Sequence, residues 1–220
     1  MAKVRCDDTV KKILTILLTL CLIIGLAACS DGNTEQAADT DNGAETAASE
    51  KTDEAGSNDG SSGNETLVVY FSVTGNTKGV AEKIASITGS DIYEIKAAQE
   101  YTEADLDWND DNSRATREQN NPDARPEIGS DPVSLDGYKT IYIGYPIWWG
   151  EEPRIMDTFV ENYNFDGITM IPFCTSGSSG IGRSGQNLAE NAGSGNWLSG
   201  DRLENSISED ELKLWIEGLK

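Results

Sequence analysis

Leu67–Ala81, LVVYFSVTGNTKGVA, decides the fold, because it joins an apolar strand to a helix through a short polar loop. Its first five residues are β-branched, aromatic or leucine without polar alternation, as in a strand buried on both faces of a parallel sheet. From Val80 onwards, apolar residues recur at helical spacing until Gly89. The stretch therefore predicts a strand, a polar turn and a helix at the start of a folded domain.

The polar turn has the composition of an anion-binding site. It consists of Ser72, Val73, Thr74, Gly75, Asn76 and Thr77. A helix N-terminus offers unpaired backbone N–H groups and the positive end of the helix dipole, to which hydroxyl and amide side chains add donors. Neither a GxxxxGKS/T nor a GxGxxG motif follows the strand, which favours a monophosphate over ATP, GTP or a dinucleotide. On this stretch alone the alternative stays open that Ser, Thr and Asn only cap the helix.

The first 28 residues have the pattern of an export signal. Basic residues precede an apolar run from Ile13 to Ala28, which is short for a membrane span. The run ends in Leu26-Ala27-Ala28-Cys29, which resembles the lipobox of bacterial lipoproteins, whose cysteine carries diacylglycerol after cleavage. We therefore expect a signal peptide over 1–28, lipidation of Cys29 and an extracytoplasmic protein anchored to the cell membrane. An uncleaved anchor helix is the alternative.

Residues 29–65 predict a disordered acidic linker that begins with the lipidated cysteine. From Ser30 to Glu65 the chain has Lys51 as its only basic residue and no large apolar side chain. Such a segment cannot bury enough surface to offset its chain entropy. Residues 66–220 then remain as one folded domain.

The composition excludes several classes of function. The formal net charge is −21, and the acidic residues extend beyond the linker, so nucleic acid is not an expected partner. An acidic surface suits a basic redox partner or simply keeps the protein soluble. The chain has no histidine, which rules out Ser-His-Asp and Cys-His catalysis and histidine metal sites. Cys174, the one cysteine after residue 65, predicts core packing rather than a reactive thiol.

Four more strands are predicted, at 91–96, 140–145, 169–174 and 196–203. Helices are predicted from Pro153 to about Asn164, over 184–191 and over 208–220, the last with a capping box of Ser208 and Glu211. The polar segment 97–137 allows one short helix at 113–119, and its aromatic residues Tyr101 and Trp108 indicate packing. Five strands alternating with helices predict a doubly wound parallel α/β sheet.

Two further strand ends carry features of a ligand site. In open α/β sheets, ligands bind outside the carboxyl ends of the strands. One end reads Pro146, Ile147, Trp148, Trp149 and Gly150, where an indole could stack on a flat aromatic ligand for about 1–3 kcal/mol. The alternative is that one tryptophan is core and the other covers a loop. The other end is a loop in which backbone can approach a ligand closely, formed by Thr175, Ser176, Gly177, Ser178, Ser179, Gly180, Ile181 and Gly182.

Taken together, these three loops resemble the flavodoxins. The segment 72–77 follows the family's Ser/Thr-x-Thr-Gly-x-Thr phosphate loop, and YFSVTGNT, GYPIWWG and PFCTSGSSGIG are similar to a bacterial branch of the family. The resemblance covers 67–220. It implies five parallel strands in the order 2-1-3-4-5, helices on both faces, and non-covalently bound FMN that cycles among its redox states.

Residue by residue, the resemblance implies that Ser72, Thr74, Asn76 and Thr77 hold the FMN phosphate. It implies that the 146–150 loop flanks the isoalloxazine, with Gly150 a candidate for the hydrogen bond to flavin N5, and that the 175–182 loop lines its other edge. Many flavodoxins place a tyrosine in this last loop, and here only small residues occur, apart from Ile181. Glu151 and Glu152, next to the tryptophans, are expected to face water.

The function expected from the resemblance is electron transfer by a monomeric, membrane-tethered FMN protein, in which no acid, base or nucleophile is required. Two alternatives remain open: an NAD(P)H-dependent quinone or flavin reductase on the same fold, which would be an enzyme, and a non-redox binding lipoprotein without cofactor. The sequence does not choose among them.

Overall fold

The computed structural model describes residues 63–219, which belong to one unit of the chain. The predicted signal peptide, Cys29 and the linker up to residue 62 lie outside the described residues. Asn64 and Glu65 are already tied to the fold: the Asn64 amide donates to Asp91, and the Glu65 carbonyl accepts from the backbone of Lys139 and Thr140. No helix within 63–219 is long and apolar enough to cross a membrane.

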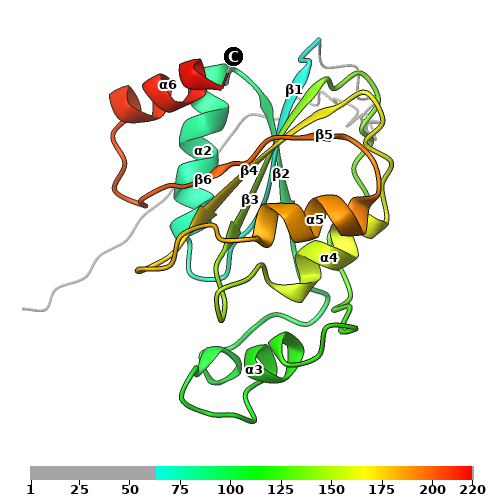
Figure 1. Cartoon of the computed structure of the whole chain (residues 1–220), viewed down its shortest axis with the longest axis vertical. Coiled ribbons are helices and arrows are strands. Elements are labelled where there is room, and N and C mark those ends of the chain that lie inside the picture. Colours follow the sequence, from blue (N-terminus) through cyan, green and yellow to red (C-terminus); the bar gives the residue numbers. More distant parts are fainter. Residues whose placement is uncertain (1–62, 220) are drawn as a thin grey trace, which may run out of the picture. The chain divides into compact units, whose positions relative to one another are not determined.

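A parallel sheet with the strand order β2-β1-β3-β4-β5 forms the centre of the domain (Figure 1). The first four strands in chain order are β1 (Thr66–Phe71), β2 (Asp91–Ile95), β3 (Thr140–Pro146) and β4 (Thr169–Thr175). Val68 of β1 lies opposite Ile92 on one side and Tyr142 on the other. This order confirms the predicted doubly wound sheet, with β2 at one edge as its alternating pattern indicated.

Helices cover both faces of the sheet (Figure 1). On one face, α2 (Asn76–Thr88) and α6 (Glu209–Gly218) pack against the sheet, with Val80, Ile84 and Leu212 fully buried. On the other face lie α4 (Arg154–Glu161) and α5 (Ser184–Ala192). Their fully buried hydrophobic residues are Ile155, Met156, Phe159, Val160 and Leu188. The predicted capping box at the start of α6 is confirmed, with both Ser208–Glu211 hydrogen bonds present.

The prediction of one continuous fifth strand over 196–203 is wrong. This stretch is divided into β5 (Asn196–Trp197) and β6 (Asp201–Arg202), both of which pair with β4. The carbonyls of Met170 and Cys174 accept hydrogen bonds from this edge, so Pro172 between them also faces it. Proline has no N–H to donate, and the ladder is interrupted opposite it. Gly200 fills the interruption at φ 68°, where a Cβ would lie 2.2 Å from the Pro172 oxygen.

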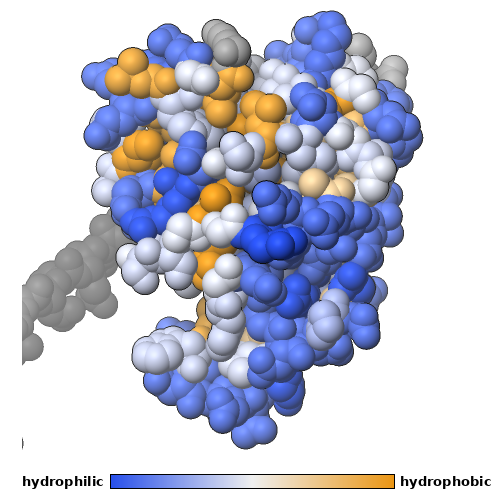
Figure 2. Space-filling model, in the orientation of Figure 1, coloured by the Kyte–Doolittle hydropathy of each residue, from blue (hydrophilic) through white to orange (hydrophobic). Residues whose placement is uncertain are grey.

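The 97–137 segment extends beyond the end of the sheet at which β1, β3 and β4 terminate (Figure 1). It contains the short helix predicted there, α3 (Arg114–Gln119), and a 3-10 turn, η1 (Ala104–Leu106). Its surface is largely hydrophilic, whereas hydrophobic side chains gather near α6 (Figure 2). The packing expected of its aromatic residues is right for Tyr101 and wrong for Trp108, whose side chain is 74% exposed.

Candidate functional site

The loop after β1 leaves backbone donors free at the start of α2. Gly75 is the N-cap residue, at φ 85°, and no side chain caps the helix. The alternative that Ser, Thr and Asn serve as caps is therefore wrong. The first backbone bond runs from Gly79 N to Gly75 O. Within 63–219, the N–H groups of Asn76, Thr77 and Lys78 have no protein acceptor, which is the arrangement that binds anions at a helix N-terminus.

Side chains of this loop are already oriented by hydrogen bonds. The Asn76 amide donates to the Thr74 hydroxyl at 3.2 Å. The hydroxyl oxygens of Thr77 and Thr175 lie 2.8 Å apart, and both side chains are buried. Thr175 also accepts a backbone bond from Ile147 N at 3.0 Å. Thr175 thus joins all three predicted loops at the carboxyl ends of β1, β3 and β4.

A cavity of about 420 Å³ opens between these loops. Eight of its lining residues were predicted from sequence: Thr74, Asn76, Pro146, Ile147, Trp148, Thr175, Ser176 and Gly177. Ser72 and Val73 instead line a neighbouring cavity of about 350 Å³, beside the end of β2. The remaining predicted residues lie in the same loops without lining this cavity: Gly75, Thr77, Trp149, Gly150, Ser178, Gly180 and Gly182.

The two tryptophans take different positions. Trp148 lines the cavity, and its ring makes edge contacts with Phe71 at 5.7 Å and Tyr101 at 5.2 Å between centroids. Trp149 is 44% exposed, with φ 51°. Gly150 follows at φ 87°, and Trp148 and Glu151 exchange backbone hydrogen bonds of 2.9 and 3.1 Å. Two successive positive φ values between these bonds define a type I′ turn. Of the two indoles, that of Trp148 lines the cavity and is the one available to a ligand there.

The glycine-rich loop lies against this turn. A Cβ on Gly182, at φ 56°, would be 3.6 Å from the Gly150 oxygen. The Ser176 hydroxyl accepts from the backbone N–H groups of Ser178 and Ser179, and Arg202 donates to the Ser178 carbonyl at 3.2 Å. The loop is therefore held in place by its own hydroxyls and by β6.

A buried charge cluster lies beneath the turn. Glu152 is fully buried, so the expectation that it faces water is wrong, while Glu151 is half-exposed. Arg154 pairs with Glu151 at 2.9 Å and with the buried Asp157 at 3.5 Å, and lies 4.0 Å from Glu152. Burial is the main cause that raises the pKa of Glu152 to about 7 and also raises the pKa of Asp157. One arginine among three carboxylates favours a neutral Glu152.

Two lining residues were missed by sequence reasoning. Glu204 and Asn205 follow β6 and reach the cavity, and the Asn205 amide donates to the Asn76 side chain at 3.0 Å. No periodicity or motif distinguishes them in the sequence. Cys174 is buried as predicted, and burial raises its pKa to about 12, which leaves an inert thiol.

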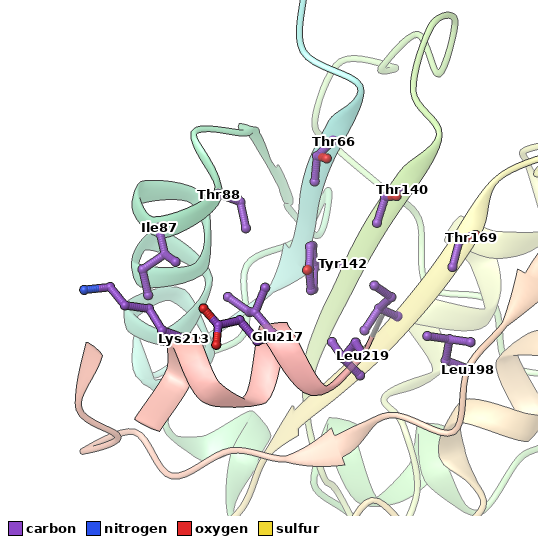
Figure 3. Close-up of a pocket in the computed structure, with 12 residues that line it drawn as sticks. Thr66, Ile87, Thr88, Thr140, Tyr142, Thr169, Leu198, Lys213, Glu217 and Leu219 are labelled. Atoms are coloured by element: carbon purple, nitrogen blue, oxygen red, sulfur yellow. The ribbon is translucent and has the colours of Figure 1, made fainter. Parts of the chain in front are cut away.

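A further cavity, of about 520 Å³, lies at the opposite ends of the strands, between the sheet and helices α2 and α6 (Figure 3). Thr66, Thr140 and Thr169 mark the amino ends of three strands there, and Lys213 and Glu217 are its charged side chains. It contains no predicted site residue and no free helix N-terminus. The cavity at the carboxyl ends is therefore the better candidate for a ligand that combines an anionic group with a flat ring.

Comparison with known proteins agrees with this fold. The family model described as Flavodoxin matches residues 65–219. A candidate flavoprotein from Bacteroides eggerthii is 44% identical, covers 70% of this chain and 96% of its own, and has a TM-score of 0.66. One from Bacteroides uniformis is 46% identical, with coverages of 70% and 97% and a TM-score of 0.66.

A flavoprotein from Lactobacillus acidophilus, solved in complex with FMN, is 27% identical, with coverages of 69% and 98% and a TM-score of 0.51. Among curated proteins, none matches the sequence. The family match extends over more than half of the chain and includes all the strands of the sheet and the three loops described above. The chain therefore belongs to the flavodoxin family.

Proposed function

We propose that the domain binds FMN without a covalent bond and transfers electrons through it. The observation that carries this proposal is the cavity at the three strand ends, where free N–H groups of α2 and the Trp148 ring lie in one site. Its volume of about 420 Å³ falls in the range of roughly 300–1,000 Å³ that ligand sites occupy. When bound, FMN supplies the redox chemistry, and the protein provides binding and electrostatics.

The donor set fits a phosphate monoester. The N–H groups of Asn76, Thr77 and Lys78 would bind the phosphate, with the Thr74 hydroxyl beside them. A Cβ on Gly75 would meet nothing within 4 Å, so the space above the loop is open to a ligand. Trp148 and Ile147 would line one side of the ring system, and Ser176 and Gly177 the other. The FMN complex of the Lactobacillus acidophilus relative supports FMN as the ligand.

Membrane tethering is part of the same proposal. A signal peptide at 1–28, lipidation of Cys29, an acidic linker to residue 65 and an FMN domain over 66–220 would place an electron carrier outside the cytoplasm. The support is the lipobox-like Leu26-Ala27-Ala28-Cys29 and the composition of the linker. A basic redox protein or a small-molecule donor would be the partner, with the protein itself monomeric. Metabolic labelling with a fatty acid, compared with a Cys29→Ser variant, tests the lipid attachment.

The visible spectrum of the purified protein tests the cofactor. We expect a yellow protein that binds added FMN after the flavin is stripped, with the affinity measured by quenching of flavin fluorescence. Thr74→Val should weaken binding by about 1.5–3 kcal/mol if its hydroxyl bonds the charged phosphate. Thr66→Val, at the opposite cavity, is the matched control and should leave the affinity unchanged. A colourless protein that binds no FMN would contradict the proposal and favour a non-redox binding role.

The second candidate is an NAD(P)H-dependent reductase. The observation in its favour is that residues 175–180 offer no side chain larger than threonine, so that side of the cavity has no aromatic cover. A nicotinamide or quinone could approach the ring there. Rapid bleaching of the bound flavin by NADH or NADPH, without a separate reductase, would favour the enzyme, and no bleaching would favour the carrier.

A further inference from the structure

We propose that Gln119, on helix α3 of the 97–137 segment, is a positioning residue that fixes the 148–151 turn against the FMN cavity. The inference rests on the proposed FMN site, because Trp148 at the start of this turn lines that cavity. Gln119 itself does not line the cavity. Its effect on the flavin would therefore be exerted through the backbone of the turn.

The side-chain amide of Gln119 holds the turn at both ends. Its Nε2 donates to the carbonyl of Trp148 at 3.0 Å and to the carbonyl of Glu152 at 3.2 Å. The Gln119 side chain is buried, and its Oε1 has no partner in the described part of the chain. The orientation of the amide is thus set by its two donated bonds, and these two carbonyls enclose the turn.

Arg154 fixes Gln119 in turn. Its guanidinium donates to the backbone carbonyl of Gln119 at 3.1 Å and to the Glu151 carboxylate, the last residue of the turn, at 2.9 Å. Arg154 is itself buried at the start of α4 and pairs with Asp157. The turn is therefore connected to α3 by the amide and to α4 by the guanidinium.

The conformation of the turn explains why it needs this support. Trp149 has φ 51°, and within 63–219 it is the one non-glycine residue at positive φ. Such a conformation is strained for a bulky side chain and persists where the surroundings hold it. Loss of the Gln119 bonds would let Trp149 relax to negative φ, and the carbonyl and ring of Trp148 would move with it. The 97–137 segment would thus act on the flavin site through this buried amide, in addition to the contact between the Tyr101 and Trp148 rings.

The test compares Gln119→Met, which keeps the length of the side chain and removes both donors, with Gln99→Met. Gln99 is an exposed residue of the same segment whose side chain makes no hydrogen bond. Three quantities are measured for each full-length protein: the Kd for FMN, the midpoint potential of the FMN-loaded form, and amide hydrogen exchange at Trp148 and Glu151, whose N–H groups are bonded across the turn, in the apoprotein. We expect Gln119→Met to raise Kd about tenfold, shift the potential and speed exchange at the turn, with Gln99→Met unchanged. A tenfold difference between the effects on the two redox states corresponds to about 59 mV for one electron.

Gln119→Glu provides a second variant, which also serves if Gln119→Met does not fold. Its carboxyl group can donate only when protonated, so its Kd relative to wild type should fall as the pH is lowered. The inference would be overturned if the folded variants had the same Kd for FMN, the same midpoint potential and the same amide exchange rates at the turn as the wild-type protein. A wild-type protein that binds no FMN would instead overturn the proposed function, and the exchange rates in the apoprotein would still decide whether Gln119 holds the turn.

Discussion

Alanine substitutions at Gly75 and Gly79 should change stability in opposite directions, although the two residues are four positions apart and neither Cβ would contact another atom within 4 Å. Gly75 is the N-cap of α2 at φ 85°, a region that costs an L-residue roughly 1–2 kcal/mol. Gly79 lies inside the helix, where alanine is favoured over glycine by about 0.8–1.0 kcal/mol. The free energies of unfolding of the two variants should therefore differ by about 2–3 kcal/mol.

Urea unfolding followed by tryptophan fluorescence measures both free energies. The m-value, the slope of the unfolding free energy against urea concentration, should be the same in both variants, which shows that unfolding exposes the same surface. FMN titration adds a second readout. Gly75→Ala should weaken binding, because a relaxed loop reorients the free N–H groups at the start of α2, and Gly79→Ala should leave the affinity unchanged. The reasoning would be refuted by a Gly75→Ala protein as stable as wild type, or by two variants that shift in the same direction.

Three further outcomes are expected. Thr77→Val should lower the free energy of unfolding in urea by about 1–3 kcal/mol, because it leaves the buried Thr175 hydroxyl without a partner. The double variant with Thr175→Val should recover most of that loss, and additive losses from the two substitutions would contradict the pairing. Burial raises the pKa of Glu152 from 4.5 to about 7, so its contribution to stability is present below the lower value and is lost as the pH rises through the higher one. Glu152→Gln should therefore gain stability over wild type in thermal unfolding near neutral and alkaline pH, and a gain largest in acid would exclude this assignment. Gly200→Ala should lower the thermal stability of the protein more than Gly193→Ala does. Both glycines have positive φ, but only at Gly200 would a Cβ lie 2.2 Å from a backbone oxygen, that of Pro172. Equal losses of stability would mean that the close approach of Gly200 to Pro172 is not a constraint.

Most of the fold could be predicted because its signals are local. The apolar runs at β1, β3 and β4 and the helical spacing in α2 and α4 each specify an element without reference to the others. The division of the fifth strand could not be read in this way. Its cause is Pro172 on the neighbouring strand, and only the pairing of β4 with β5 and β6 makes that proline relevant.

The candidate site divides along the same line. Its three loops were predicted because each follows a strand directly, and parallel strands bring their carboxyl ends to one edge. Asn205, which lines the cavity, and Gln119, which bonds the 148–151 turn, were not predicted, since each comes from a segment whose path depends on tertiary packing. The burial of Glu152 was missed for a related reason. Its partners Gln119, Arg154 and Asn187 come from three different helices, and their approach depends on tertiary packing.

The interruption of the ladder beside β4 also affects what this edge of the sheet offers to other chains. A long regular edge strand presents a row of unpaired N–H and C=O groups on which a strand from another molecule can add. Here β5 and β6 contain two residues each and are separated by residues 198–200, of which Gly200 has φ 68°. An incoming strand would find only two residues in register before the backbone turns away. The proline that interrupts the sheet from within therefore also protects this edge against intermolecular strand addition and aggregation.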